Sequence, residues 1–575
     1  MDRMIRLELN NFLMNAGILG FIRLLEFLGA QKNQDYTFEE NALCISRDYL
    51  NRTNLAKGFI ACANHLFFNR SVVAQWDKEF SLLHAETKKY LTQSQGAKTE
   101  KELLALYQQI VGKESSFKKF KNIEKSYPYL KNTYGLDLKE MIDELIKAKD
   151  VESKYERLTQ LERVLKHEEV RRHFLIVSVA DRVLSRFWIK GFLATSTGAV
   201  YVKSGEDMEM QFHKTCVVNL EKYLKEPAAF DSKGKRVCAE CGCDHVQSSA
   251  PTLSFLNDVM DDVKRKASAF WGFNKGVANL CEVCAFNYLL VPFGFTLMGD
   301  KAVFINDNSS LDMLYHVNTV NELKGEGTDH ITFKFYNQLV QAYLKKETVQ
   351  LHNIQLVTRL MDKETQRYQF NILSYNVLHL INRAEKSLEA LSKSSTFTLN
   401  DRRFNPYEQA IFNLLNHQHQ YSLIQYLCRL GLDEQLSLKT AYALRHLWVI
   451  QQKTRQLQQE LQEGGMTMSI EDYNMYIEQA LSDGRKLNAI FFNEAKDKTG
   501  LICRLLNAVQ SNNRDLFLQT IIRLHGVNKT PLSKGFIESL SNEKLFNDMA
   551  HAYLLGFQGV YAKKEMEGEQ NNEAI

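Results

Sequence analysis

Two CxxC pairs are the strongest constraint on how this chain folds. The first pair is Cys238 and Cys241, and the second is Cys281 and Cys284. A CxxC turn presents two thiolates to one metal ion, and two such turns complete a tetrahedral site in which zinc binds the deprotonated sulfurs. The sequence therefore predicts one structural Zn²⁺ ion on these four cysteines. Four sulfur ligands leave no open position on the metal, so we expect the site to be non-catalytic.

The surroundings of the pairs leave some alternatives open. A redox CxxC or a chance spacing would also give such a pair, but two pairs in one region favour a metal. Cys243 and His245 lie close to the first pair and could replace a ligand, although we interpret them as bystanders. Gly242 fits a tight turn after the first pair. The long interval before the second pair indicates an inserted helix at 253–270.

The composition narrows the class of protein. Only 6 prolines occur in 575 residues, which permits long helices. The net charge of +4 is too small to indicate nucleic-acid binding by itself, so a phosphate-binding surface would have to come from local clusters. The other cysteines lie mostly among apolar neighbours, which is typical of reduced thiols, and we expect a cytoplasmic protein. The most apolar window, 280–298, is interrupted by polar residues and proline, and we interpret it as buried core.

We expect an α+β fold that is predominantly helical. The pattern divides into a mixed α/β N-terminal region at 1–230, a four-cysteine zinc-binding module with strands at 231–345, a helical region at 346–465 and a C-terminal helical bundle at 466–575. In the first region, apolar residues recur at helical spacing around Gly17 and Gly20, which would allow close packing against a neighbour.

Catalytic motifs are scarce. The segment from His167 to His173 is similar to a zinc-protease helix, but its second histidine is displaced from the required position. The sequence has no GxxxxGK[ST] phosphate loop and no GxSxG nucleophile motif. Asp329 and His330 remain a candidate pair for a zinc-dependent nuclease or hydrolase, without a second metal motif. We therefore expect a binding protein and not an enzyme, with a purely structural scaffold as a further alternative.

Local clusters of basic and aromatic residues are candidates for nucleic-acid contacts, because lysine and arginine bind phosphates and aromatic rings stack on bases. Solvated helix surface is the competing interpretation of each cluster. The candidates are Lys118, Lys119, Lys121, Lys264, Arg265, Lys266, Lys275, Arg485, Lys486, Arg504 and Arg523.

Several segments, in this order, resemble the large subunit of a type I-B CRISPR Cascade of the Cst-type branch. They span nearly the whole chain. Beside the two CxxC pairs, they are Asn15–Phe21, Cys284–Thr296, Ala302–Ser310, Arg504–Ala508 and Ala552–Phe557.

The resemblance implies a non-catalytic subunit of an RNA-guided DNA-binding complex. In that family the large subunit recognises the protospacer-adjacent motif in double-stranded target DNA, helps to open the duplex and docks a helicase-nuclease. The guide RNA reads the rest of the target by base pairing, a division of labour also known for an unrelated effector. The implied partners are the guide RNA, the target DNA, the Cascade backbone and small subunits, and the helicase-nuclease, with no membrane. Region 1–230 would be the candidate for recognising the adjacent motif.

The resemblance also implies that the C-terminal bundle is similar to a Cascade small subunit, which some type I-B systems translate from an internal start. Glu463-Gly464-Gly465 can be encoded by a strong ribosome-binding sequence whose spacing favours Met468 over Met466 as the start. Ser469 would then cap the first helix. The product would have roughly 110 residues, within the usual range for a domain. The alternative is that Gly464-Gly465 is only a helix stop.

Overall fold

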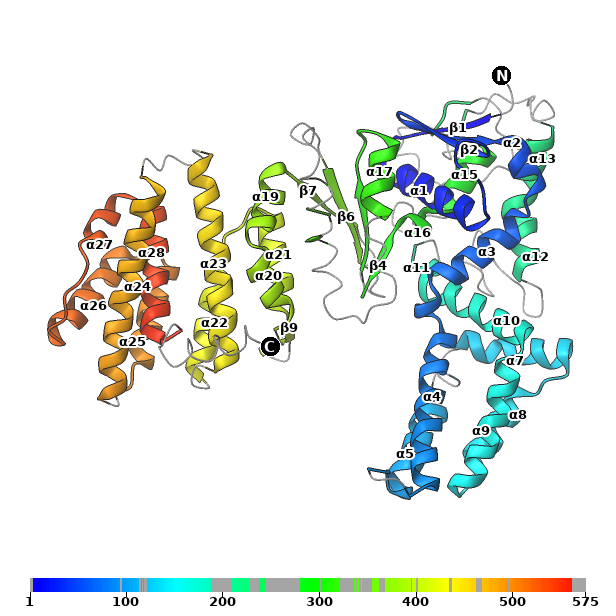
Figure 1. The fold of residues 1–575 in the computed structure, drawn as a ribbon, viewed down its shortest axis with the longest axis horizontal. Coiled ribbons are helices and arrows are strands. Elements are labelled where there is room, and N and C mark those ends of the chain that lie inside the picture. The colour runs from blue at the N-terminus through cyan, green and yellow to red at the C-terminus, as the bar shows by residue number, and fades with distance from the viewer. Residues whose placement is uncertain are drawn as a thin grey trace. The chain divides into compact units, whose positions relative to one another are not determined.

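The computed structural model describes most of the chain. The longer stretches outside the described residues are 188–207, 227–236, 244–279, 320–335, 344–353 and 561–575. The chain forms two compact units: the first comprises Met1–Thr319 and Gln355–Phe370, and the second comprises Val320–Ile354 and Asn371–Ile575. The expected fold class is confirmed, since helices predominate and the strands form small sheets (Figure 1). Among the described residues, every helix is too short or too polar to cross a bilayer.

The first unit begins with a three-stranded antiparallel sheet in the order β1–β3–β2. Its strands alternate in burial where one face meets the core, as in β1, whose Ile5 and Leu7 are buried. The strands and the helices that follow them are β1 (Met4–Glu8), α1 (Phe12–Phe27), β2 (Tyr36–Glu39), β3 (Ala42–Ser46), α2 (Arg47–Arg52) and α3 (Leu55–Leu66).

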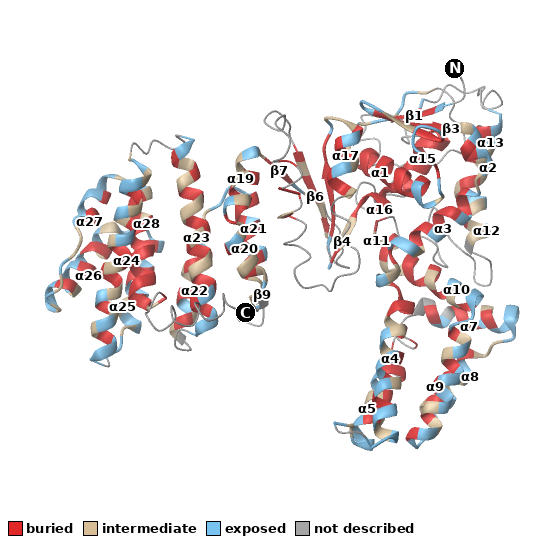
Figure 2. Ribbon diagram, viewed as in Figure 1, coloured by how far each residue is buried: buried red, intermediate tan, exposed pale blue. Residues whose placement is uncertain are grey.

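Helix α1 is the buried centre of the first unit. Every residue from Leu13 to Leu25 is buried (Figure 2). The predicted close packing is confirmed. A Cβ atom on Gly17 would lie 2.4 Å from the carbonyl oxygen of Asn287, and one on Gly20 would lie 2.1 Å from that of Leu290. Because no side chain fits in that space, the two glycines allow α1 to touch the backbone that follows the second CxxC pair.

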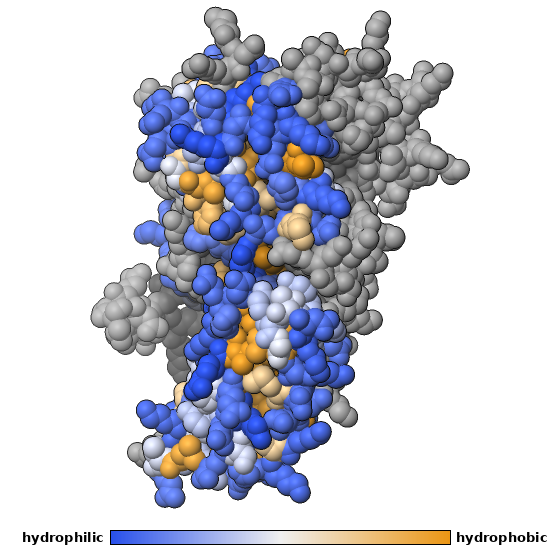
Figure 3. All heavy atoms as spheres, turned by 90° about the vertical axis from the view of Figure 1, so that its right-hand side faces the viewer, coloured by the Kyte–Doolittle hydropathy of each residue, from blue (hydrophilic) through white to orange (hydrophobic). Residues whose placement is uncertain are grey.

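The helices at residues 72–179 form a separate group with an apolar core of its own. Trp76 lies parallel to Phe117, with ring centroids 4.4 Å apart, and meets Phe174 edge to face. The group begins with α4, which contacts α5, α9 and α10. Its helices are α4 (Val72–Leu91), α5 (Glu100–Val111), α7 (Lys121–Tyr134), α8 (Leu138–Lys147), α9 (Val151–Leu165) and α10 (Glu168–Val179). The face of the first unit shown in Figure 3 is mainly hydrophilic where it is coloured, with small apolar patches between the polar residues.

The remaining elements of this part of the chain include a four-stranded sheet in the order β4–β5–β6–β7. The predicted strand around Ala302–Ile305 is confirmed as β5, which pairs antiparallel with β4 and β6. Two helical stretches contain π-helical turns, η2 (Ala180–Leu184) and η3 (His213–Val217). The other elements are α11 (Ser185–Phe187), α12 (Met208–Phe212), α13 (Val218–Lys225), α15 (Glu282–Leu289), α16 (Val291–Gly294), β4 (Thr296–Met298), β5 (Lys301–Asn306), α17 (Leu311–Thr319), β6 (Ile354–Leu360) and β7 (Tyr368–Leu373).

The described residues of the second unit after β7 are mostly helical, with one hairpin formed by β8 (Phe397–Leu399) and β9 (Arg402–Phe404). Its longest described helices include α23, which precedes Gly464-Gly465, and α24, which follows it. The helices are α19 (Tyr375–Arg383), α20 (Glu385–Ser392), α21 (Pro406–Leu415), α22 (Tyr421–Asp433), α23 (Leu438–Glu460), α24 (Ile470–Asn493), α25 (Thr499–Gln510), α26 (Arg514–Val527), α27 (Gly535–Glu538) and α28 (Glu543–Gln558).

Helices α24 and α28 form the centre of the C-terminal bundle. Gly484 and Gly556 lie where the two helices cross, and a Cβ atom on Gly484 would come within 2.2 Å of the Tyr553 carbonyl oxygen. The predicted cap of α24 is confirmed, because the side chain of Ser469 accepts a hydrogen bond from the backbone N–H of Asp472. The bundle thus begins at a well-defined helix start directly after Met468.

Candidate metal centre

Four cysteine sulfurs gather in the first unit. The sulfur atoms of Cys238, Cys241, Cys243 and Cys281 all lie within 4.8 Å of one another. Those of Cys241 and Cys281 are 3.7 Å apart. Two sulfurs bound to tetrahedral zinc at about 2.3 Å would be about 3.8 Å apart. The donor set and its spacing therefore fit a metal ion with four sulfur ligands.

The first three of these cysteines lie on one tight turn. The backbone N–H of Cys238 donates to the carbonyl of Cys243 at 2.8 Å, and the N–H of Gly242 donates to the carbonyl of Cys238 at 3.1 Å. Gly242 has a φ of 70°, in the left-handed region that glycine adopts without steric cost. The turn predicted at this glycine is present, and it brings three thiols to the same side of the backbone loop.

The second pair lies at the start of helix α15. Cys281 is the N-cap residue, and its sulfur accepts a hydrogen bond from the backbone N–H of Cys284 at 3.4 Å. The N-terminal end of a helix carries partial positive charge, which stabilises a thiolate at this position. Hydrogen bonds from the neighbouring thiols, that of Cys241 first, lower the pKa of the Cys238 thiol. Cys238 is therefore the thiol most ready to lose its proton and bind a metal, whereas its hydrogen bonds raise the pKa values of the Cys243, Cys281 and Cys284 thiols.

Cys243 is part of the mutual group of four, whereas the sequence had indicated a bystander. Cys284, the predicted fourth ligand, is fully buried, and its thiol interacts with those of Cys238, Cys241 and Cys281. The structure therefore brings five sulfurs together. Those of Cys238, Cys241 and Cys281 interact both with Cys243 and with Cys284. Spacing along the chain favoured the CxxC pairs and left Cys243 as a possible replacement ligand, although a third cysteine two residues after a CxxC turn was the available signal. His245 lies outside the described residues.

Glu240 fastens the first turn to helices α1 and α15. Its carboxylate accepts hydrogen bonds from the Tyr288 hydroxyl at 2.6 Å and from the side-chain amides of Asn11 at 3.1 Å and Asn10 at 3.3 Å. Burial raises the pKa of this carboxyl, and the hydrogen bond from Tyr288 opposes the rise. Because Asn11 also caps α1, one carboxylate joins the cysteine turn to the start of the central helix.

Three of the segments that carry the resemblance, Asn15–Phe21, Cys284–Thr296 and Ala302–Ser310, meet around this centre. The side chain of Asn15 on α1 donates to Asn306 at the end of β5 at 2.7 Å. Asn287 on α15 donates to the carbonyl of Met14 at 3.1 Å. These contacts, with the glycine packing of α1, join three stretches that are far apart in the sequence. These stretches of the resemblance are therefore the ones that pack the cysteine site against the core of the first unit.

Comparison with known proteins identifies this region. Residues 231–296 match the family model described as CRISPR-associated protein (Cas_CXXC_CXXC). The chain is a CRISPR-associated protein with a CXXC–CXXC domain. All five clustered cysteines lie in the matched segment. No curated protein matches the chain. The CRISPR association implied by the resemblance is thereby confirmed.

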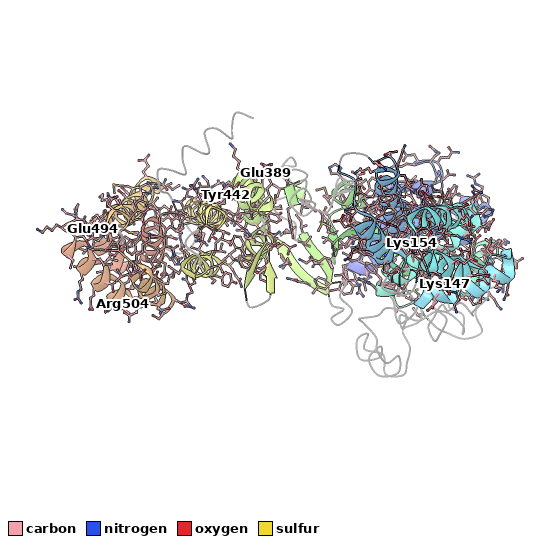
Figure 4. All side chains as sticks on the ribbon, turned by 90° about the horizontal axis from the view of Figure 1, so that it is seen from below. Lys147, Lys154, Glu389, Tyr442, Glu494 and Arg504 are labelled. Atoms are coloured by element: carbon pink, nitrogen blue, oxygen red, sulfur yellow. The ribbon has the colours of Figure 1, made fainter. Side chains whose placement is uncertain are left out.

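Some of the candidate nucleic-acid residues belong to the part of the chain that the structure describes, and the others do not. Lys486, Arg504 and Arg523 are exposed on the C-terminal bundle, and Figure 4 shows Arg504 at its outer side. Arg485 is half-buried on α24, and Lys486 forms an ion pair with Asp483 at 3.2 Å. Lys121 belongs to α7. The others lie outside the described residues: Lys118, Lys119, Lys264, Arg265, Lys266 and Lys275. Asp329 and His330, the pair considered for hydrolysis, lie outside them too.

Proposed function

We propose that this CRISPR-associated protein is the non-catalytic large subunit of a type I-B Cascade, an RNA-guided surveillance complex. The observation that carries the proposal is the family match over 231–296, together with the ordered segments that pack around it. In this role the chain recognises the protospacer-adjacent motif, helps to open the duplex and docks the helicase-nuclease. The guide RNA then reads the target strand by base pairing. A cytoplasmic location follows from these partners.

The metal we propose for the cysteine cluster is Zn²⁺. Thiolates at tetrahedral spacing select zinc over magnesium or calcium, which prefer oxygen ligands. Bound there, the ion would cross-link the turn at Cys238–Cys243 to the N-terminus of α15. Glu240 then connects the same turn to α1 through Asn11. The ion therefore acts as a structural staple of the first unit, and its closed donor set gives it no substrate position.

We further propose that the C-terminal bundle is also produced separately, from Met468, as the small subunit of the complex. The support is the helix start at Ser469 and the extensive packing of α24 on α28, which depends on residues from 468 onward. In that product, Lys486, Arg504 and Arg523 would keep their exposed positions and could contact the phosphates of the displaced strand.

Co-purification tests the proposal. The chain, tagged at its N-terminus, is expressed with its genomic neighbours, and the recovered material is analysed by mass spectrometry and nucleic-acid staining. We expect a short guide RNA, several partner proteins and a fragment that begins at Met468. Replacing the Met468 codon by leucine should remove the fragment, while the same change at Met466 should leave it. Recovery of the full-length chain alone, without RNA, would contradict the Cascade assignment and favour a scaffold role.

A further inference from the structure

A cleft of 1270 Å³ opens in the second unit where α21, α22 and the hairpin strand β9 meet. It is separate from the cysteine cluster and from the basic residues considered above. Its volume exceeds that of a usual pocket for one small ligand, which is about 300–1,000 Å³. The residues that line it are Phe404, Gln409, Asn413, His417, Gln418, His419, Tyr421, Ser422, Leu423 and Tyr426.

The lining combines aromatic rings with amides. Tyr426 on α22 meets Phe404 edge to face, with ring centroids 4.9 Å apart, and both rings are half-buried. Gln409 and Gln418 line the cleft with exposed side chains, and the Gln409 amide N–H donates to the Asn413 side-chain oxygen at 3.2 Å. Among the described residues that line the cleft, none is a lysine, an arginine or a carboxylate. These described residues offer ring faces and amides, which suit a neutral, planar, hydrogen-bonding group.

A column of stacked rings forms the inner wall. His419 stacks on Tyr421 at 5.2 Å, and Tyr421 stacks on His551 of α28 at 4.4 Å. Tyr421 is held in place because its hydroxyl accepts from Arg455 at 3.0 Å and donates to Asp548. Such a column is rigid and presents a preformed ring edge and face to an incoming planar group.

The same column borders a second, smaller cleft of 380 Å³, which shares Tyr421, Ser422 and Tyr426 with the first. Arg429 lines this second cleft and is exposed, with its guanidinium bonded to Asn507 and Gln510 on α25. The two clefts therefore place a cation near an aromatic site. Grooves that bind single strands combine these two features, because cations bind phosphates and aromatic rings stack on bases.

The backbone at His417 supports the assignment. His417 has a φ of 54°, in the left-handed region that is uncommon for residues other than glycine. The conformation ends α21 and is fixed by the N–H of His417, which donates to the Leu414 carbonyl at 3.2 Å. It leaves the imidazole exposed at the mouth of the cleft. Its ring adds a further aromatic surface beside the cleft.

We propose that this cleft binds an unpaired nucleobase of a single strand, stacked against Tyr426 and hydrogen-bonded to the amides of Gln409 and Gln418. The proposal rests on the proposed nucleic-acid function, and it adds a base-binding site to the phosphate contacts. Aromatic side chains bind bases with little dependence on sequence, because every base has a π face. The site therefore suits a strand of any sequence, as an opened duplex would supply.

The test uses the full-length chain and a fluorescently labelled oligothymidylate, with binding measured by anisotropy. Loss of one stacking ring weakens binding on the order of tenfold, so we expect that effect from Tyr426→Ala. Tyr426→Phe keeps the ring and should bind as the unchanged protein does. Phe492→Ala is the matched control, because Phe492 is an aromatic residue of the same unit that is 82% exposed on α24, away from the cleft. Photocrosslinking with 5-iododeoxyuridine should label residues of the cleft in the unchanged protein.

Wild-type affinity in Tyr426→Ala, absence of binding by the unchanged chain, or crosslinks confined to other elements would each overturn the proposal. The base could belong to a nucleic-acid strand or to a free nucleotide, and competition by thymidine monophosphate distinguishes these two sources. We expect the mononucleotide to compete only weakly, and equal affinity for it would instead assign the cleft to free nucleotides. The outcome is distinct from failure of the Cascade assignment, because Tyr426→Ala should leave recovery of guide RNA and partner proteins unchanged.

Discussion

The sulfur atoms of Cys241 and Cys281 lie 3.7 Å apart, although the two cysteines are 40 residues apart in the chain. That separation is close to one edge of a tetrahedron of sulfurs around zinc. Two deprotonated sulfurs at this distance would repel each other, so a cation between them stabilises the arrangement. The short distance between these two sulfur atoms is therefore an argument that the first unit is built around a metal ion.

Removal of a shared ligand should release the metal. Cys238, Cys241 and Cys281 each interact with Cys243 and with Cys284, whereas Cys243 and Cys284 do not belong to the same group of mutually close sulfurs. The four thiols left in Cys281→Ser therefore do not form one tetrahedral set, and we expect this variant to lower the zinc content from one ion per chain to nearly none. Metal analysis of the purified chain measures this. Hydrogen exchange should show loss of protection in α15, because the turn and the helix are no longer cross-linked. Cys503→Ser is the control, since Cys503 is exposed on α25. Full zinc content in Cys281→Ser would contradict the predicted ligand set.

Cys243 and Cys284 should substitute for each other as the fourth ligand. Each has interactions with the three shared sulfurs, so either serine variant leaves four thiols. We expect one zinc per chain in Cys243→Ser and in Cys284→Ser, and loss of zinc in the double variant. Cobalt substitution reports the donor set, because its spectrum differs between four-sulfur and three-sulfur sites. A single variant that loses its metal would identify that cysteine as the sole fourth ligand.

The sequence predicted the parts of this site that depend on local spacing. The CxxC pairs, the turn at Gly242 and the close packing of Gly17 each follow from a few adjacent residues, and the structure contains all three. Glu240 could not be predicted in this way. Its partner Asn11 lies 229 residues away, and a glutamate between two cysteines is usually only a surface residue. Contacts of this kind depend on how distant segments pack, for which a single sequence has no periodic signal.

The ion pair of Arg455 and Asp548 should be essential to the second unit. The pair is buried at 2.7 Å, with side chains 2% and 0% exposed, and it joins α23 to α28. Arg455→Met leaves a buried carboxylate without its cation, and we expect a loss of about 3–5 kcal/mol in the free energy of unfolding of this unit. Hydrogen exchange of the backbone amides of α28 measures this loss of stability.

A second ion pair of α23 provides the control for this change. Arg383 and Glu460 form a half-exposed pair at 2.7 Å. Because solvent screens it, Arg383→Met should cost less than about 1 kcal/mol. The double variant Arg455→Met with Asp548→Leu should recover much of the lost stability, since both charges are then absent. Equal effects of Arg455→Met and Arg383→Met would refute the importance of the buried pair.

The second unit should lose stability in mild acid because of His551. This histidine is buried, its Nδ1–H donates to the Asn547 carbonyl, and its Nε2 accepts from the Gln425 amide. Burial lowers its pKa to about 4, which outweighs the opposing effects of the Asn547 carbonyl and Asp548. In the unfolded chain the pKa is about 6.5. Between these values the unfolded state binds more protons, so stability is full above about pH 6.5 and falls toward pH 4.

We expect the unit to be about 2 kcal/mol less stable at about pH 5 than at about pH 7.5 from this group. Hydrogen exchange of α28 at a series of pH values, corrected for the intrinsic exchange rate, gives the slope. His551→Asn removes the titrating ring, so its overall stability should be lower but its slope over this range flatter. His417→Asn should keep the wild-type slope, because His417 is exposed. An unchanged slope in His551→Asn would show that other groups cause the acid sensitivity.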